Sequence, residues 1–178
     1  MNRQLLIIFG FILFLNSCKQ SQPNETKASE TNEGGEVVEL NSVVDSYFES
    51  DSLVIILKSE LEKIALNPEF EIHKESTPNK HVDNLIDTII TRTFKNTKLT
   101  SYKTINEEWF YEAKIENTDF ELNDFIKVGT KKDVIEKHLA IEIKNDSLRI
   151  SNSEQTSAFL LIFESGVLKL IEYEGYMD

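Results

Sequence analysis

The sequence predicts an α+β fold in which short helices pack on an antiparallel β-sheet. Between residues 40 and 64, apolar residues recur at intervals of three and four, the spacing of one face of a helix. From residue 70 onward, short segments rich in Ile, Thr and aromatic residues alternate with turn residues, a pattern typical of antiparallel strands. A chain of 178 residues, 40% of them hydrophobic, is long enough to build a sizeable core.

The first 17 residues are typical of a secretory signal peptide. Arg3 supplies the positive charge, and residues 5–15 form an apolar run. A helix that spans a membrane needs about 20 apolar residues, so this run is too short to remain as a span. The run ends in four residues that resemble the lipobox of bacterial lipoproteins, with Leu three positions before the Cys and a small residue directly before it: Leu15, Asn16, Ser17 and Cys18.

The lipobox resemblance implies that residues 1–17 are removed and that Cys18, the single cysteine of the chain, carries the lipid that attaches the protein to a membrane. A thiolate is a strong nucleophile and therefore a natural acceptor for a diacylglyceryl group. The alternative is an ordinary signal peptide that leaves Cys18 as a free thiol. Lys outnumbers Arg by 16 to 3, which suggests an AT-rich genome and, with the lipobox, a Gram-negative bacterium. Lys19 follows the Cys, where an Asp would suggest retention in the inner membrane. We therefore expect attachment to the outer membrane, on its periplasmic face.

Residues 18–36 are predicted to be a flexible tether. They contain no large apolar residue and are rich in Ser, Thr, Asn, Gln and Glu, a composition that cannot bury enough surface to fold. An α+β domain is expected over residues 37–178. The order of its elements leaves open two tandem units, residues 37–120 and 121–178.

Two short helices, packed together, are predicted at the start of the domain. The first spans residues 40–47 and the second residues 53–64. Ser50 lies where an N-cap of the second helix is expected, and Pro68 lies beyond its end. A buried strand over residues 54–57 is the alternative, but the apolar stripe continues through the whole segment and favours a helix.

A meander of antiparallel strands is predicted next. The expected strands are residues 70–75, 82–94, 99–105 and 109–115, separated by turn residues. Aromatic residues on a strand usually belong to a core, so residues 109–111 are interpreted as core rather than as a ligand site. Alternation divides the last strand into two faces: Trp109, Tyr111, Ala113 and Ile115 on one, and Phe110, Glu112 and Lys114 on the other.

A third helix is predicted after Gly129. Thr130 is the expected N-cap, and Asp133 completes an approximate capping box. The apolar residues expected to point inward are Val134, Ile135 and Leu139.

Three or four antiparallel strands are predicted to follow this helix. The clearest are residues 157–164 and 167–173, because Ser165-Gly166 between them is a typical two-residue hairpin turn. Pairing across this turn places Phe163 opposite Leu168 and Leu161 opposite Leu170.

Residues 128–135 (VGTKKDVI) and the hairpin that follows resemble the SmpA/OmlA (BamE-like) group of outer-membrane lipoproteins. The resemblance implies a helix pair packed on an antiparallel sheet, an architecture that also occurs in β-lactamase-inhibitor-type proteins. The chain departs from the group's pattern in two places. It lacks the Met after the Gly, and it has Leu139-Ala140 where the group has the Leu-Gly-x-Pro that closes the helix.

The sequence contains none of the common catalytic motifs, so no catalytic residue and no cofactor is predicted. Glu71, His73 and Glu75, with His81 nearby, form a pattern that can bind zinc, but a solvated strand face is the favoured interpretation. Residues 116–124 alternate oxygen ligands as a calcium loop does, but they lack its mid-loop Gly and closing Glu. An acidic loop without metal is therefore expected there.

The net charge of −12 disfavours a nucleic-acid partner, because no basic stripe is available to neutralise phosphates. The expected function is that of a lipid-anchored, non-catalytic interaction or scaffold module whose protein partner is unknown. The alternative is an inhibitor or immunity-type protein that binds a secreted enzyme or toxin. Tyr173 and Tyr176 are the predicted partner contacts, with an edge of the core as the alternative for both.

Overall fold

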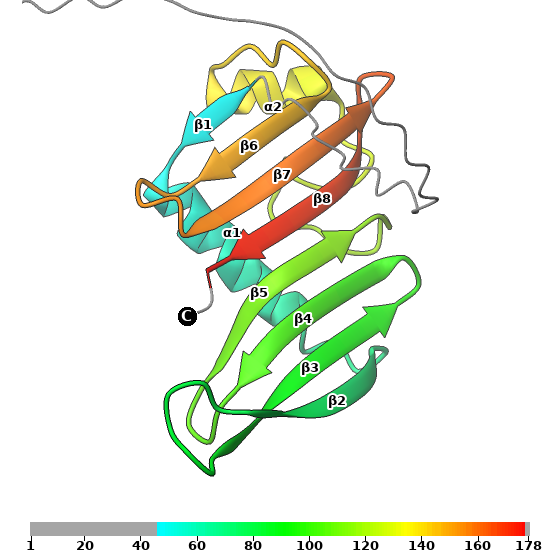
Figure 1. Ribbon diagram of the computed structural model, residues 1–178. Helices are drawn as coiled ribbons and strands as arrows, with labels where there is room; N and C mark the ends of the chain where they lie inside the picture. Colours follow the sequence, from blue (N-terminus) through cyan, green and yellow to red (C-terminus); the bar gives the residue numbers. More distant parts are fainter. Residues whose placement is uncertain (1–45, 177–178) are drawn as a thin grey trace, which may run out of the picture. The chain divides into compact units, whose positions relative to one another are not determined.

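The computed structural model describes residues 46–176, which form one eight-stranded mixed sheet and two helices (Figure 1). The strand order is β1-β6-β7-β8-β5-β4-β3-β2. The elements are β1 (Tyr47–Glu49), α1 (Asp51–Ile64), β2 (Glu71–Pro78), β3 (Ile86–Phe94), β4 (Thr97–Lys103), β5 (Glu108–Ile115), α2 (Lys132–Leu139), β6 (Ser147–Ser151), β7 (Ser157–Glu164) and β8 (Val167–Gly175). Because about 46% of the described residues lie in strands and 17% in helices, the fold is dominated by its sheet. The prediction of an α+β fold built from short helices on an antiparallel sheet is wrong.

Pairing between distant segments explains this difference. β5 pairs with β8, so that Ala113 lies opposite Tyr173 and Ile115 opposite Ile171. This pairing joins the strands of both predicted tandem units into one sheet and buries all four side chains. β1 pairs in parallel with β6, which makes the sheet mixed rather than antiparallel. Local periodicity does not reveal which distant strands will pair, since pairing depends on tertiary packing.

α1 confirms the helix predicted over residues 53–64. Ser50 is its N-cap, and its Oγ accepts a hydrogen bond from the backbone N–H of Leu53 at 3.3 Å. Val54, Leu57 and Leu61 are buried. The helix predicted over residues 40–47 is wrong at its C-terminal end, because Tyr47 begins a strand; residues 40–45 lie outside the described residues.

The predicted meander is confirmed as β2 to β5, with changed boundaries. β2 continues to Pro78, through residues 76–78 that were expected to lie in a loop, and the connection to β3 spans residues 79–85. A register shift between β4 and β5 leaves Tyr111 without a partner, because Glu112 pairs with Thr100 and Phe110 with the next residue, Ser101. Such a bulge reverses which face the preceding residues point to. The predicted face assignment of β5 is therefore correct at Ala113 and wrong at Phe110, which is buried.

The last hairpin is confirmed, and Phe163 lies opposite Leu168 as predicted. A register shift between Ile162 and Phe163 then places Leu161 opposite Ile171 rather than Leu170.

α2 differs from its prediction in two respects. Its N-cap is Lys131 rather than Thr130, and the Lys131 side chain makes no capping hydrogen bond. Ile135 is its one buried residue, whereas Val134 is exposed and Leu139 is half-buried.

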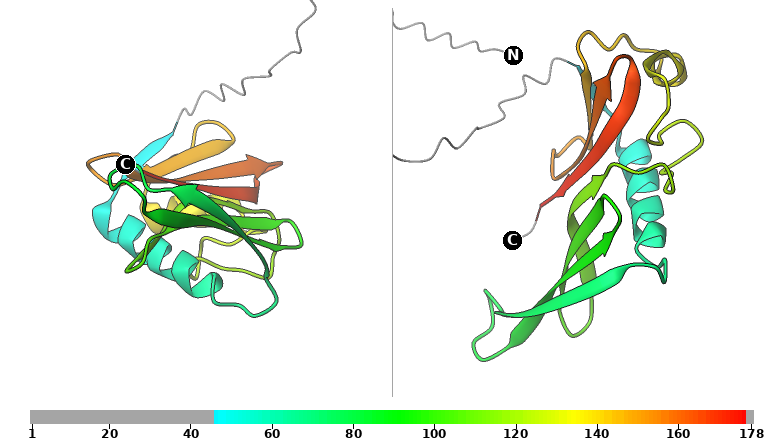
Figure 2. Two further views of the ribbon diagram at one scale, coloured as in Figure 1. Left: turned by 60° about the horizontal axis from the view of Figure 1, so that its bottom comes forward. Right: turned by 90° about the vertical axis from the view of Figure 1, so that its right-hand side faces the viewer.

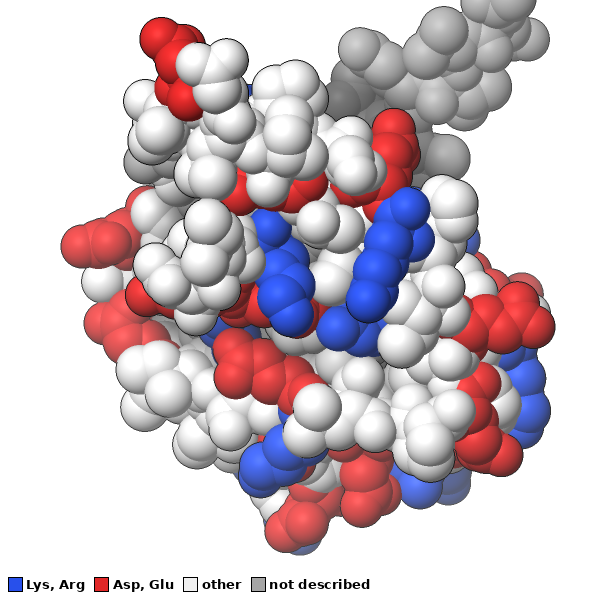
Figure 3. All heavy atoms as spheres, turned by 90° about the horizontal axis from the view of Figure 1, so that it is seen from below, with Lys and Arg blue, Asp and Glu red and all other residues white. Residues whose placement is uncertain are grey.

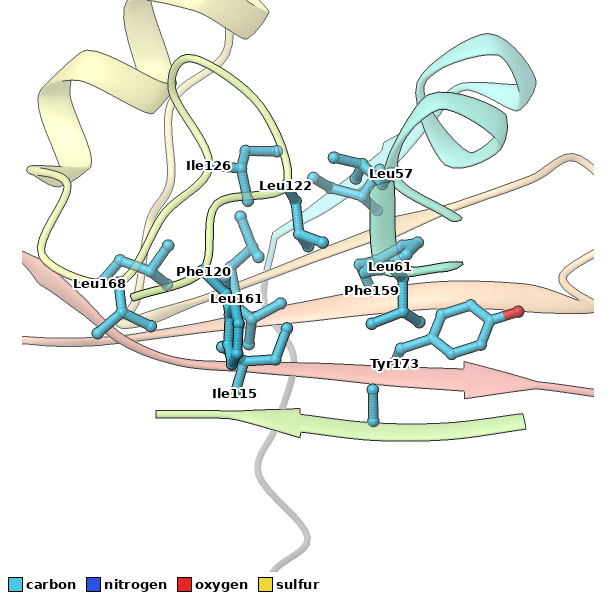
Figure 4. Packing of buried hydrophobic residues seen from close by; sticks show 14 of the residues in the cluster. Leu57, Leu61, Ile115, Phe120, Leu122, Ile126, Phe159, Leu161, Leu168 and Tyr173 are labelled. Carbon is cyan, nitrogen blue, oxygen red and sulfur yellow. The ribbon is translucent and has the colours of Figure 1, made fainter. Parts of the chain in front are cut away.

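The hydrophobic core lies on one face of the sheet. α1, α2 and the connection between β5 and α2 all lie on this side (Figure 2). Figure 4 shows Leu57 and Leu61 of α1, Leu122 and Ile126 of the connection, and Phe159 of β7 directed toward one another. The acidic segment 116–124 thus contributes core residues as well as surface charge.

Candidate functional site

The sheet face opposite α1, called the open face below, carries no helix among residues 46–176 (Figure 2). Residues directly opposite each other in neighbouring strands point to the same face. The register therefore places two rows of side chains on the open face. One row runs through Glu75, Ile89, Tyr102 and Trp109, and the next through His73, Thr91, Thr100, Glu112 and Glu174.

Three aromatic residues lie together on this face. The rings of Tyr102 and Trp109 are stacked, with centroids 6.4 Å apart and an interplanar angle of 19°. Trp109 is 42% exposed, and Tyr111 is half-buried. The bulge at Tyr111 produces this arrangement, because it turns Phe110 into the core and Trp109 out of it. The prediction that residues 109–111 belong to the core is correct for Phe110 alone.

Carboxylates surround these aromatic rings. Glu112 lies directly opposite Glu174, a cross-strand pairing of like charges that is destabilising by itself. Each of the two is held by an exposed ion pair: Glu112 with Lys98 at 3.3 Å, and Glu174 with Arg149 at 3.1 Å. Exposed ion pairs of this kind contribute about 0–1 kcal/mol, so these carboxylates stay available to other cations.

The pKa values of Tyr111 and Tyr102 are both raised, and neighbouring carboxylates contribute to each shift. Burial raises the pKa of Tyr111, and the negative charges of Glu112 and Glu75 raise it further. The hydrogen bond that Tyr102 donates to Asp87 raises the pKa of Tyr102, and burial and the charge of Asp87 add to the effect. We define the aromatic–acidic patch as six residues of the open face: Tyr102, Trp109, Tyr111, Glu75, Glu112 and Glu174.

Asp87 lies on β3 beside the Tyr102 end of this patch and is 1% exposed. Its Oδ2 accepts hydrogen bonds from the Tyr102 hydroxyl and from Nδ2 of Asn79, both at 2.5 Å. Its Oδ1 is buried and has no hydrogen-bond partner within the described residues. The negative charge of this carboxylate acts on the Tyr102 end of the patch.

A second polar cluster lies on the covered face of the sheet, beside the C-terminal end of α1. Arg92 contacts Oε1 of Glu108 at 2.7 Å, donates to Oγ of Ser101 at 2.9 Å and lies over the ring of Phe110. Ser101 donates to the same carboxylate oxygen at 2.6 Å. Burial acts to raise the pKa of Glu108, but the hydrogen bonds from Ser101 and Arg92 and the charges of Arg92 and Lys103 outweigh it and lower that pKa. Nε of Arg92 is buried and has no hydrogen-bond partner within the described residues, whereas the carboxylate of Glu108 is paired with both Arg92 and Ser101. These contacts join neighbouring strands, so we interpret the cluster as structural.

The residues predicted as sites occupy different places. Leu15, Asn16, Ser17 and Cys18 lie outside the described residues, so their role stays a prediction. The two predicted partner contacts separate: Tyr173 is 1% exposed and packs against Phe159, whereas Tyr176 is 70% exposed. Tyr173 therefore belongs to the core, the alternative interpretation, and only Tyr176 is accessible to a partner.

The two segments with metal-like residue patterns, in which no metal was expected, do not bring their ligands together. Within residues 46–176, no three His, Cys, Asp or Glu side chains lie close enough to hold a metal ion. In the segment 116–124, Asp119 pairs with Lys95 at 2.5 Å and Glu121 with Lys127 at 3.2 Å. Asp119 and Glu121 are thus directed to separate lysines.

Three comparisons with known proteins were negative: no protein-family model matches the chain, and neither a curated protein nor a solved structure matches it. In the described part of the chain, no helix is long and apolar enough to cross a membrane.

Three residues of the patch were not singled out from the sequence as site residues: Tyr102, Glu112 and Glu174. Glu174 belongs to the segment Glu172-Tyr173-Glu174, whose alternation signals two outward carboxylates around a buried ring. The exposure of Trp109 could not be predicted, because it depends on the bulge and the sequence has no Gly or other marker of a bulge near Tyr111.

Proposed function

We propose that this chain is a lipid-anchored, non-catalytic interaction module on the periplasmic face of the outer membrane of a Gram-negative bacterium. The lipid anchor rests on the lipobox residues, with Cys18 as the site of attachment. The interaction role rests on one observation, the exposed aromatic and acidic side chains on a sheet face that no described helix covers. Exposed aromatic residues are enriched at protein-binding surfaces.

One further observation supports this proposal. The resemblance of residues 128–135 to outer-membrane lipoproteins favours the outer membrane. The non-catalytic role rests on the sequence, which contains none of the common catalytic motifs.

We also expect no nucleic-acid partner. Acidic residues outnumber Lys and Arg by 31 to 19. On the face shown in Figure 3, Lys and Arg side chains lie among Asp and Glu side chains rather than in a continuous basic patch.

The second candidate function is an inhibitor or immunity-type protein. The acidic side chains of the open face favour it, because they complement a basic enzyme or toxin and speed association with it. Inhibition of a purified basic enzyme or toxin by this chain distinguishes this role, since a scaffold leaves that activity unchanged.

The test of the anchor is metabolic labelling with a clickable fatty acid, followed by mass spectrometry of the mature N-terminus. Wild type should carry the label and begin at Cys18, and Cys18→Ala should lose the label. Ser17→Ala is the matched control, because it keeps a small residue before the Cys and should stay labelled. A wild-type protein that lacks the label and begins at another residue refutes the anchor.

A further inference from the structure

We propose that the aromatic–acidic patch binds an extended, basic polypeptide segment that presents Arg or Lys side chains. The inference rests on the proposed interaction role and specifies the chemistry of the partner. It follows from three features of the patch: its unbalanced charge, its exposed aromatic rings and its width across the sheet.

The negative charge of the patch favours a cationic ligand. Glu112 and Glu174 lie opposite each other on neighbouring strands, and the exposed ion pairs with Lys98 and Arg149 compensate their repulsion only weakly. Glu75 makes no ion pair within the described residues. The carboxylate of Asp87, which accepts the Tyr102 hydroxyl hydrogen bond and has one unpaired oxygen, adds a negative charge beside the rings. A guanidinium or ammonium group between Glu112 and Glu174 relieves their repulsion, which no uncharged ligand does.

The aromatic rings favour a cation carried on a side chain. Trp109 offers an exposed ring face that Tyr102 holds in place by stacking. Arg and Lys bind over such rings, and the planar guanidinium also stacks on them. Trp and Tyr are also the residues that most often carry the binding energy of protein interfaces.

The width of the patch favours a polypeptide over a small cation. Its carboxylates extend from Glu75 on β2 to Glu174 on β8, with β3, β4 and β5 between them. At about 4.8 Å per strand, these four steps cover about 19 Å. An extended chain of about six residues covers that distance, and its alternate side chains point to one side.

Trp109 is the single tryptophan of the chain, so intrinsic fluorescence reports directly on the patch. The full chain, purified in a nonionic detergent, is titrated with an eight-residue peptide of alternating Arg and Thr. We expect a saturable change in Trp109 emission. The affinity should fall at least tenfold between about 0.05 and 0.5 M salt, since the Debye length shrinks from about 14 Å to about 4 Å. The same peptide with Gln in place of Arg should produce no change.

The variant Glu112→Gln/Glu174→Gln should weaken binding at least tenfold. Glu142→Gln/Glu164→Gln is the matched control: it removes two exposed carboxylates outside the patch, changes the net charge equally, and should alter the affinity less than twofold. If the first variant fails to fold, Trp109→Phe with a fluorescently labelled peptide gives an independent test. Its affinity, measured by anisotropy, should fall at least threefold.

The proposal is overturned if the Arg peptide leaves Trp109 emission unchanged, or if both double variants lose affinity equally, since charge alone then explains binding. It is also overturned if spermine competes as well as the peptide at equal charge concentration. Each of these results leaves the anchor intact, because lipid labelling at Cys18 tests it separately. Loss of labelling with retained peptide binding rejects the anchor alone.

Discussion

Replacing Arg92 with Met should destabilise the protein because it leaves Glu108 without its cation. The side chains of Arg92 and Glu108 are 12% and 23% exposed, and their charged atoms lie 2.7 Å apart. Removing one partner of a fully buried ion pair costs about 3–5 kcal/mol. Because water reaches part of this pair, we expect Arg92→Met to lower the free energy of unfolding by about 2–3 kcal/mol, roughly a 30- to 150-fold change in the folding equilibrium.

A double-mutant cycle isolates the interaction from packing effects. Glu108→Gln should also destabilise the protein, because it leaves the Arg92 guanidinium without a carboxylate. The double variant should lose about 1–2 kcal/mol less than the sum of the two single variants, since the second change then removes an already unpaired group. Urea unfolding followed by Trp109 fluorescence measures all four proteins. Additivity within about 0.5 kcal/mol would falsify the assigned pairing.

The same pair predicts a pH dependence with a definite sign. The pKa of folded Glu108 lies below its usual value because hydrogen bonds from Ser101 and Arg92 outweigh burial. The ionised carboxylate therefore stabilises the fold above its unfolded pKa of about 4.3, and this contribution disappears as the pH falls through the lowered folded pKa. The difference in stability between wild type and Glu108→Gln should thus narrow below about pH 4. A constant difference down to pH 2 contradicts this assignment.

Two further substitutions test the core and a helix terminus. Leu161→Asp places a carboxylate at a fully buried position and should cost several kcal/mol, on the order of the whole stability of a domain; a cooperative thermal transition within a few degrees of wild type contradicts the core assignment. Lys131→Asp should instead stabilise the protein by about 0.5–1 kcal/mol, because Lys131 is an N-cap without a capping hydrogen bond and Asp supplies both an acceptor and a negative charge for α2. A lower urea midpoint for Lys131→Asp would show that residue 131 does not cap α2.

The sequence by itself determined those elements that local interactions stabilise. α1 follows from an apolar stripe and a capping Ser50, both of which act within the helix. The final hairpin follows from Ser165-Gly166, where both residues adopt the positive φ that such a turn requires. The lipobox is likewise local, and Cys18 could be proposed as an anchor without knowledge of the fold.

Only the tertiary structure decided how these elements combine and where the candidate site lies. The pairing of β5 with β8 and of β1 with β6 joins segments about 60 and 100 residues apart, and such contacts leave no periodic signal in either segment. The bulge at Tyr111 had the largest consequence for function, because side chains alternate with a period of two and one extra residue moves Trp109 from the expected core to the open face. The juxtaposition of Glu112 and Glu174 depends on the same non-local pairing. The aromatic–acidic patch therefore arises from strand register, a property of the folded chain that depends on tertiary contacts and that local sequence does not encode.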